Sequence, residues 1–239
     1  MDALSKLQDM VSSSRRIVFF GGAGVSTESG IPDFRSVDGL YHQSYAYPPE
    51  TILSYSFFSR NPQVFYRFYK EKMIYTGAKP NPAHIALARW EKAGRLCAII
   101  TQNIDGLHQT AGSKNVVELH GTIHQNHCQR CKKAYGLDFI LQSEGVPKCA
   151  CGGTIKPDVV LYEENLDQHV MEKTVREMAD ADMLMIGGTS LSVYPAAGFV
   201  QAFTGKYLAI INKTPTSLDQ KADAVIAAPI GETLQKIVV

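Results

Sequence analysis

The sequence predicts an α/β fold, a doubly wound parallel sheet that carries a smaller inserted domain. Short apolar, β-branched runs recur along the 239 residues, and helical patterns separate several of them. Most runs are apolar at nearly every position, as strands are when helices cover both faces of a parallel sheet. Two stretches break that rhythm, one rich in Tyr and Phe and one with four cysteines. Alternating strands and helices therefore form the main domain, and the two stretches form the insertion.

The apolar runs give the expected strands in chain order. They occupy 16–22, 96–101, 116–119, 158–162, 182–188, 207–212 and 223–229. The clearest helix is NPAHIALARWEKAG, where Asn81 fits the N-cap, Pro82 the first helical position and Gly94 the position after the end.

The interruptions define the expected domain limits. We expect residues 1–40, 79–120 and 157–239 to form the main domain. Residues 41–78 form a helical insertion and 121–156 a cysteine-bearing insertion, and we expect the two to pack together as the small domain.

Composition and charge exclude several classes of protein. The chain has 24 basic and 23 acidic residues and a net charge of +1, so it lacks the basic excess of a broad nucleic-acid surface. Its first residues, MDALSKLQDMVSSSRR, contain no apolar run of signal-peptide length. No later segment has the roughly 18 uninterrupted apolar residues of a membrane span. We therefore expect a cytoplasmic protein that binds no membrane and no specific nucleic acid.

A glycine-rich loop, GGAGVSTESGIPDFR at 21–35, follows the first strand. Gly22 and Gly24 can adopt positive φ and let the backbone approach a ligand, and the amides that follow can hold a pyrophosphate. Thr27 stands where the usual dinucleotide fingerprint has its third glycine, so the match is partial. A tight structural turn remains the alternative interpretation.

Four of the five cysteines are spaced as metal ligands. Cys128 and Cys131 form one close pair, and Cys149 and Cys151 form another after seventeen residues. Two such pairs can supply four thiolates to one tetrahedral Zn²⁺ and leave no position for a reacting water. The zinc is therefore expected to be structural. Cys97, within an apolar run, is interpreted as a buried hydrophobic residue.

Polar residues follow several strands where an open α/β sheet binds its ligands. Each has an ordinary alternative: Asp105 can cap a helix, Asn212 can make a turn, and His120 can be a hydrogen-bonded histidine at a strand end. The set as a whole is Gln102, Asn103, Asp105, His120, Gly188, Thr189, Ser190, Asn212 and Lys213.

These motifs together resemble the sirtuins, NAD-dependent protein lysine deacylases. GAGVS, GIPDFR, TQNIDGLH, ELHG, the four cysteines, GTSLSVYP and IIN occur in the family's order, over residues 16 to 230. The compact length is similar to that of prokaryotic members. The resemblance implies a Rossmann-like domain, an NAD site between it and the zinc-bearing small domain, and an acyl-lysine peptide in the same cleft.

The resemblance also implies roles for individual residues. His120 is the expected general base, with Asn103 and Asp105 as further catalytic residues that hold nicotinamide and the ribose. The other implied NAD contacts are Gly22, Ala23, Gly24, Thr27, Asp33, Phe34, Arg35, Gln102, Ile104, Gly188, Thr189, Ser190, Asn212, Lys213 and Ile230. The implied reaction transfers the acyl group from lysine to ADP-ribose and releases nicotinamide.

The substrate side is predicted from IKPDVVLYEENL. Val160 to Glu163 can pair with a peptide as an added strand, and Tyr162 and Val193 would line the tunnel for the lysine stem. The chain departs from the family pattern at Lys156, Tyr162 and Glu163, where Arg, Phe and Gly are usual. Glu163 suggests a preference for basic residues beside the target lysine; the alternative is that it points to solvent.

The helical insertion bears on the choice of acyl group. Tyr69 and Lys72 occupy the positions of a Tyr-x-x-Arg pair found in family members that remove succinyl groups. Lysine matches a carboxylate less well than arginine, so we expect acetyl and other uncharged acyl groups. Alternatively, the tyrosines of 41–78 are simply core residues of the small domain.

Two rival functions remain at this stage. The first is a mono-ADP-ribosyltransferase that uses the same NAD site with a protein nucleophile as acceptor. The second is a non-catalytic zinc-ribbon module that binds nucleic acid, which the neutral charge and the polar strand ends disfavour.

Overall fold

A computed structural model describes residues 2–34, 39–42 and 45–239. Its centre is a six-stranded sheet in which neighbouring strands run parallel, in the order β3-β2-β1-β7-β8-β9. The strands are β1 Ile17–Gly21, β2 Leu96–Thr101, β3 Val116–Glu118, β7 Met183–Gly187, β8 Tyr207–Ile211 and β9 Ala224–Ile226. The predicted doubly wound parallel sheet is confirmed.

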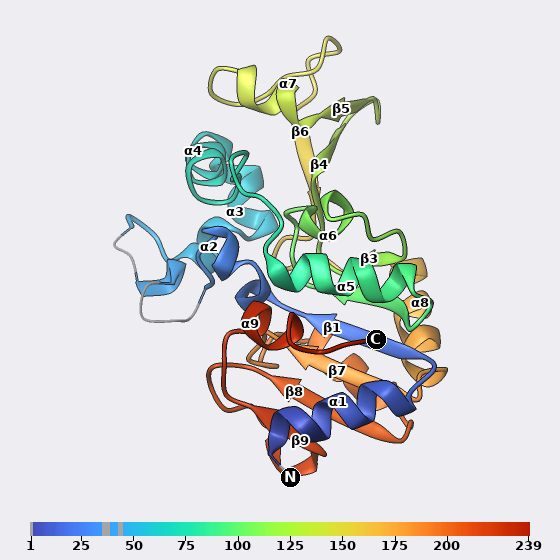
Figure 1. The fold of residues 1–239 in the computed structure, drawn as a ribbon. Helices are drawn as coiled ribbons and strands as arrows, with labels where there is room; N and C mark the ends of the chain where they lie inside the picture. The colour runs from blue at the N-terminus through green and yellow to red at the C-terminus, as the bar shows by residue number, and fades with distance from the viewer. Residues whose placement is uncertain (1, 35–38, 43–44) are drawn as a thin grey trace.

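Helices cover both faces of this sheet (Figure 1). One face packs on α1 Ala3–Ser13, α5 Pro82–Lys92 and α9 Ile230–Leu234. The other packs on α8 Gln168–Ala179 and the 3₁₀ segment Ala196–Ala202. Successive residues of β1 alternate between the two cores: Phe19 lies in the first and Phe20 in the second, and both are fully buried. This burial on both faces explains why the strands are apolar at nearly every position.

The start of α5 forms as the sequence indicates. The Asn81 side chain accepts a hydrogen bond from the Ala83 amide at 2.9 Å, and the Asn81 amide in turn donates to His84 Nδ1 at 3.2 Å. Pro82 is the first helical residue, and Gly94 has a φ of 74° just beyond the end. The cap also reaches the glycine-rich loop, because Asn81 Nδ2 donates to Val25 O at 2.7 Å.

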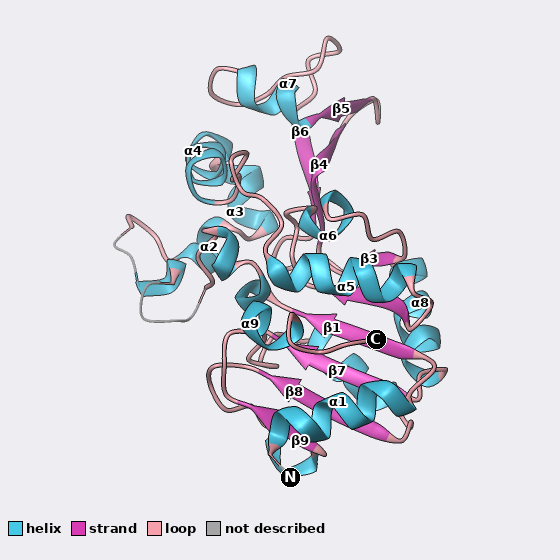
Figure 2. Cartoon of the chain, in the orientation of Figure 1, coloured by secondary structure: helices cyan, strands magenta, loops and turns pink. Residues whose placement is uncertain are grey.

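The two insertions lie beyond the carboxyl-end side of the main sheet (Figure 2). The first holds α2 Pro49–Ile52, α3 Tyr55–Arg60 and α4 Pro62–Lys72, and the second holds β4 Gly121–Cys128, β5 Ala134–Gly136 and α7 Leu137–Gln142. Residues of both belong to one core, because Phe65, Tyr66, Ile140 and Ile155 are members of the same buried cluster. The predicted small inserted domain, helical module plus cysteine module, is confirmed.

One expected strand lies in a different sheet. Residues 158–162 were expected to continue the main sheet, but the strand is β6 Ile155–Val159, and it pairs antiparallel with β4 in a three-stranded sheet of order β5-β4-β6. The predicted boundary at 157 therefore cuts a strand of the small sheet. An apolar run does not show whether its strand joins the main sheet or a second sheet. The other domain limits stay predictions.

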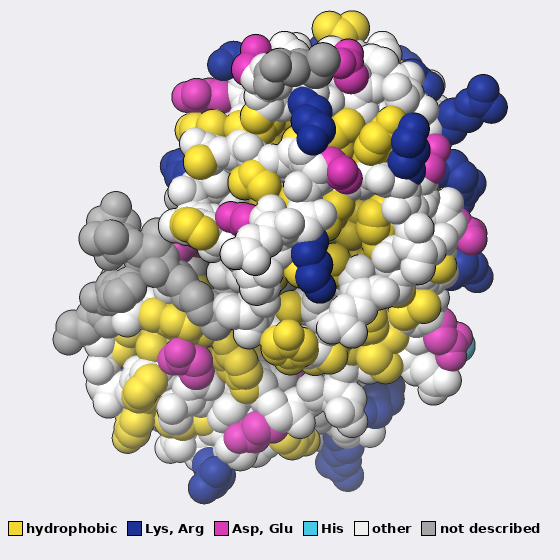
Figure 3. Space-filling view, turned by 90° about the horizontal axis from the view of Figure 1, so that it is seen from below, with side chains coloured by type: hydrophobic (Ala, Val, Ile, Leu, Met, Phe, Trp, Pro, Cys, Tyr) yellow, Lys and Arg dark blue, Asp and Glu magenta, His cyan; other side chains and the backbone are white. Residues whose placement is uncertain are grey.

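The surface charges and the helices both agree with the composition. The face in Figure 3 carries both basic and acidic side chains among hydrophobic ones, as a net charge of +1 suggests. Within the described residues, each helix is too short or too polar to cross a membrane.

Candidate active site

A cavity of about 950 Å³ opens at the carboxyl ends of the parallel strands. It lies where the chain order of the sheet reverses, because β1 is flanked by β2 on one side and β7 on the other. Side chains and loops after β1, β2, β3, β7 and β8 line it, together with residues of the helical module and of the segment after β6. This crevice is where open α/β sheets bind nucleotides.

The glycine-rich loop lines the cavity, but its glycines serve a different need from the one predicted. Gly22 has a φ of −127°, and neither Gly22 nor Gly24 is among the residues with positive φ. Instead, a Cβ on Gly22 would lie 2.7 Å from Thr189 Cβ, and a Cβ on Gly24 would lie 2.8 Å from Gly188 Cα. Hydrogen bonds from Gly22 N to Gly187 O (3.2 Å) and Gly24 N to Gly188 O (2.8 Å) hold the two loops together. The glycines therefore allow β1 and β7 to bring their loops into contact.

The loop continues along the cavity wall. Ala23, Thr27, Asp33 and Phe34 all line it, and Thr27 Oγ1 donates to Gly24 O at 3.0 Å. Arg35, predicted to contact phosphate, lies outside the described residues.

A hydrogen-bonded group of side chains joins this loop to the end of β2. Ser26 Oγ donates to Asp105 Oδ2 at 2.6 Å and accepts from Asn103 Nδ2 at 3.0 Å. Asp105 Oδ1 accepts from Leu107 N at 2.9 Å, so the capping role considered for Asp105 is also present. Asn103, Asp105 and neighbouring Ile104 line the cavity. Sequence reasoning did not select Ser26; its place five residues after a strand, in the same loop as the glycines, was the available signal.

His120 lines the cavity, and one of its ring nitrogens has a defined partner. Its Nδ1 lies 3.0 Å from Gln102 O, and a carbonyl only accepts, so Nδ1 carries the proton and Nε2 of the neutral ring is a free acceptor. Burial lowers the pKa of His120, against a smaller opposing effect of the Gln102 carbonyl. The neutral form is therefore favoured near pH 7. This is the protonation state and the tautomer that a general base at Nε2 needs.

The strand ends beyond β1 form the other side of the cavity. Gln102 Nε2 donates to Thr189 Oγ1 at 3.0 Å, which links the ends of β2 and β7. Asn212 Nδ2 donates to Thr214 O at 2.8 Å, so Asn212 does make the turn given as its alternative role. Lining residues on this side are Gly188, Thr189, Ser190, Asn212, Lys213 and Ile230.

The predicted substrate residues fall into two groups. Val160, Tyr162, Glu163, Val193 and Lys72 line the cavity. Tyr69 does not: it is fully buried in the core of the small domain, where its ring stacks on Phe65 with centroids 5.5 Å apart. Although residues three apart share a helix face, Tyr69 is buried in the core, whereas Lys72, the last residue of α4, lines the cavity. The structure thus places Tyr69 among the core tyrosines rather than beside a substrate.

Lys156 and the two glutamates of the substrate segment have defined partners. Lys156 Nζ forms an ion pair with Glu164 Oε2 at 2.8 Å, and that oxygen also accepts from Leu161 N at 2.8 Å. Glu163 is exposed, and its carboxylate accepts hydrogen bonds from Ser56.

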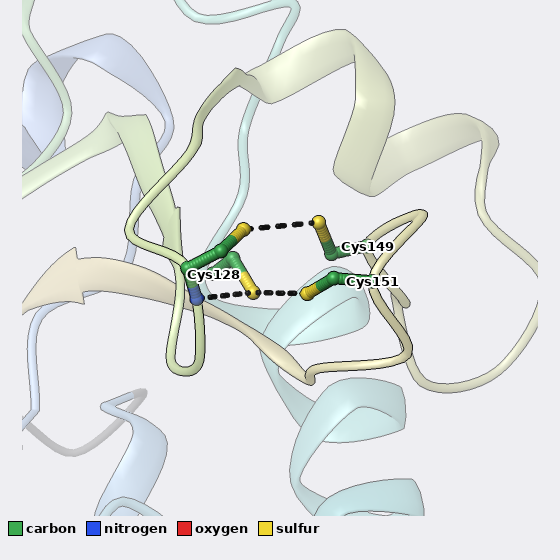
Figure 4. Close-up of side chains that lie close together, drawn as sticks. Cys128, Cys149 and Cys151 are labelled. Atoms are coloured by element: carbon green, nitrogen blue, oxygen red, sulfur yellow. Dashed lines mark hydrogen bonds between the residues drawn. The ribbon is translucent and has the colours of Figure 1, made fainter.

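The four predicted cysteine ligands converge in the small domain. Cys128 Sγ lies 3.5 Å from Cys151 Sγ, and Cys131 Sγ lies 3.6 Å from Cys149 Sγ. All four sulfurs lie within 4.8 Å of one another, close to the spacing that Zn–S bonds of about 2.3 Å impose on a tetrahedron. Figure 4 shows the sulfurs of Cys128, Cys149 and Cys151 directed toward a common point. The cluster fits structural zinc, whereas Cys97 lies partly exposed on β2.

Comparison with known proteins identifies the family. The model of the Sir2 family matches residues 22–195, which span the glycine loop, the end of β2, His120 and the four cysteines. The chain belongs to the Sir2 family. NAD-dependent protein deacetylases of that family in Clostridium perfringens and Clostridium acetobutylicum are 56% and 53% identical to it, over 99% and 100% of this chain and 99% of each relative.

Solved Sir2 structures share the whole fold. One, described as a structural basis for the mechanism and regulation of Sir2 enzymes, has a TM-score of 0.91 at 40% identity and covers 99% of this chain and 96% of that one. A Sir2 complex with a p53 peptide and NAD⁺ has a TM-score of 0.86 at 39% identity, covering 98% and 96% of the two chains. The predicted membership of the sirtuins is confirmed.

Proposed function

We propose that this chain is an NAD-dependent protein lysine deacetylase. It transfers the acyl group from lysine to ADP-ribose and releases nicotinamide. The observation that carries this proposal is the position of His120, a neutral imidazole with an unprotonated Nε2, in one cavity with the glycine loop and the substrate segment. Relatives more than half identical to this Sir2 chain are NAD-dependent protein deacetylases.

Each part of the cavity has a role in this reaction. Bound NAD supplies the glycosidic bond that breaks and the sugar that receives the acyl group. His120 Nε2 accepts a proton from a ribose hydroxyl, because its partner nitrogen is held by Gln102 O. Asn103 and Asp105, both fixed by Ser26, hold nicotinamide and the ribose. The loops of Gly24 and Thr189 hold the pyrophosphate and the adenosine half.

The opposite wall receives the acyl-lysine. The peptide pairs with the segment around Val160 to Glu163, and Tyr162 and Val193 flank the lysine stem. Lys72 lines the same cavity and its ammonium lies 5.8 Å from the centre of the Tyr45 ring. Because Tyr69 is turned away, we expect acetyl peptides to turn over faster than succinyl peptides.

The proposal also covers the cysteine cluster, the cellular compartment and the macromolecular partners. The cysteine cluster holds a zinc ion outside the cavity, so the ion stabilises the small domain and takes no part in the chemistry. Four reduced thiolates persist in a reducing compartment, and we therefore place the protein in the cytoplasm. Its macromolecular partners are acyl-lysine proteins, and we assign it neither nucleic acid nor membrane binding.

Nicotinamide release from NAD tests this function. The parent protein should release nicotinamide only when an acetyl-lysine peptide is present. His120→Ala should lose at least about 100-fold in completed deacetylation, since general-base catalysis contributes that much or more. The pH profile of the parent should show an acid limb below the ordinary histidine pKa, because burial lowers the pKa of His120 and its base form survives to lower pH. A His120→Ala protein that deacetylates at the parent rate would remove His120 from this role.

A further inference from the structure

The substrate segment is fastened to the helical insertion along one edge. Tyr162 N donates to Leu53 O at 3.0 Å, and Tyr55 N donates to Tyr162 O at 3.0 Å. These bonds form an isolated parallel bridge between Ser54 and Tyr162. The chain just before α3 therefore acts as a one-residue strand beside the segment that lines the cavity.

Glu163 extends this attachment through its side chain. Its carboxylate accepts from Ser56 N at 2.8 Å through Oε2 and from Ser56 Oγ at 2.9 Å through Oε1. Both carboxylate oxygens are thus engaged by one residue in the first turn of α3. The charge faces the helical insertion, which weakens the expectation that it selects basic peptide residues.

The backbone of Glu163 makes this attachment unusual. Its φ of 76° lies in the left-handed region, which residues with a Cβ seldom occupy and glycine occupies freely. A glutamate at such a position is retained only where surrounding contacts hold it. The two bonds to Ser56 are contacts of that kind, and a glycine there would lack them.

We propose that Glu163 is a positioning residue, whose carboxylate fixes the peptide-binding segment to the helical insertion. The proposal rests on the function given above. The other end of the segment is held separately, because Val160 N donates to His120 O at 2.9 Å, whereas Glu164, which pairs with Lys156, adjoins Glu163. Glu163 therefore sets the end that lies farther along the chain from His120. Its loss should weaken peptide binding and leave NAD binding unchanged.

Four variants distinguish the effect of the Glu163 carboxylate from the effect of its left-handed backbone. Glu163→Ala keeps a Cβ at the left-handed position and removes both bonds to Ser56. Glu163→Gly also removes the bonds but relieves the backbone, and Glu163→Gln keeps an acceptor for the Ser56 amide. Ser56→Ala keeps Glu163 and removes the hydrogen bond that the Ser56 hydroxyl donates to it. Glu71→Ala, on exposed α4 surface of the same insertion, is the matched control.

The expected result is a selective change in peptide affinity. Acetyl-peptide KM, and peptide Kd by calorimetry, should rise about 10-fold in Glu163→Ala and in Glu163→Gly, the amount expected for a lost charge-assisted hydrogen bond. The KM for NAD should stay within about 2-fold, and Glu163→Gln should recover most of the loss. In a double-mutant cycle, Glu163→Ala and Ser56→Ala should be less than additive. Amide exchange at 160–163 should quicken in Glu163→Ala but not in Glu71→Ala.

Several results would overturn the role. Unchanged peptide Kd in Glu163→Ala would do so, as would an equal rise in both KM values, which would indicate general damage to the fold. If Glu163→Gly bound peptide as the parent does, the carboxylate would be dispensable. A parent protein that binds no acetyl peptide would overturn the proposed function and this role together, whereas normal binding that no Glu163 variant alters would overturn this role alone.

Discussion

Ser26 is the residue through which the glycine loop reaches the end of β2. It is 1% exposed, and its hydroxyl both donates to Asp105 and accepts from Asn103. A buried hydroxyl with two charged or polar partners cannot be removed without leaving them unsatisfied. Ser26 therefore keeps the two side chains proposed to hold nicotinamide in one orientation.

Ser26→Ala should slow nicotinamide release by roughly 10- to 100-fold, the range that corresponds to the loss of one hydrogen bond to a carboxylate. Peptide Kd should not change, because Ser26 lies on the cofactor side of the cavity. Steady-state rates with calorimetry of peptide binding would check both parts. A variant with parent turnover would show that Asn103 and Asp105 are held by other contacts.

At the scale of elements, α5 and α6 Leu107–Thr110 meet through two buried histidines beneath the site. The rings of His84 and His108 lie 4.7 Å apart, and the two residues are 0% and 1% exposed. Burial lowers the pKa of His84 to about 4, with the Asp105 carboxylate opposing, and burial lowers the pKa of His108 to about 3, with His84 adding to the effect. Both rings are therefore neutral in the folded protein near pH 7.

These histidines should make the protein less stable in mild acid. Below pH 6.5 the unfolded chain binds protons that the folded chain does not, so the free energy of unfolding should fall as the pH drops toward about 4. The loss should reach on the order of 1–2 kcal/mol for each group by pH 5. His108→Phe, which keeps a ring but cannot titrate, should have a shallower pH dependence in urea unfolding.

His169→Gln is the control for that experiment, because His169 is exposed on α8. It should unfold with the pH dependence of the parent. Parallel curves for the parent and His108→Phe would mean that the buried pair does not control acid stability.

The cysteine module makes a second prediction at this scale. Cys128 ends β4, and Cys149 and Cys151 lie on the loop before β6, so a shared ion would join the end of β4 to the loop that leads into β6. We expect about one zinc ion per chain. Cys151→Ala should lose the ion and lower the melting temperature, whereas Cys97→Ala should retain it. Native mass spectrometry measures the ion directly, and a full zinc content in Cys151→Ala would contradict the ligand set.

At the scale of the whole molecule, the motifs and their order predicted the main features. Strands such as β1 and β7 are apolar on both faces, which is enough to predict a covered parallel sheet, and the polar residues after them then converge at its carboxyl edge. The four cysteines predicted their own cluster by spacing. Those features depend on short stretches of chain, and short stretches are what a sequence shows directly.

Other features depend on contacts between distant segments and were not predictable in the same way. The glycines at 22 and 24 are required by the backbone of Gly188, over 160 residues away along the chain. Residues 155–159 join the small sheet because β4 offers a partner, and Tyr69 faces the core because α3 and α4 pack there. Glu163 contacts Ser56 only once the segment after β6 packs against the helical insertion. The orientation of each side chain follows from tertiary packing.

The whole-molecule claim is that one cleft brings an acyl-lysine to the sugar of NAD beside His120. Mass spectrometry of the products tests it most directly, with acetyl-lysine peptide and NAD as the only substrates. The account predicts equal amounts of deacetylated peptide, nicotinamide and O-acetyl-ADP-ribose from the parent, and almost none of the acetylated sugar from His120→Ala. ADP-ribose attached to the peptide with its acetyl group intact, as a mono-ADP-ribosyltransferase would produce, or free acetate formed without NAD, would contradict it.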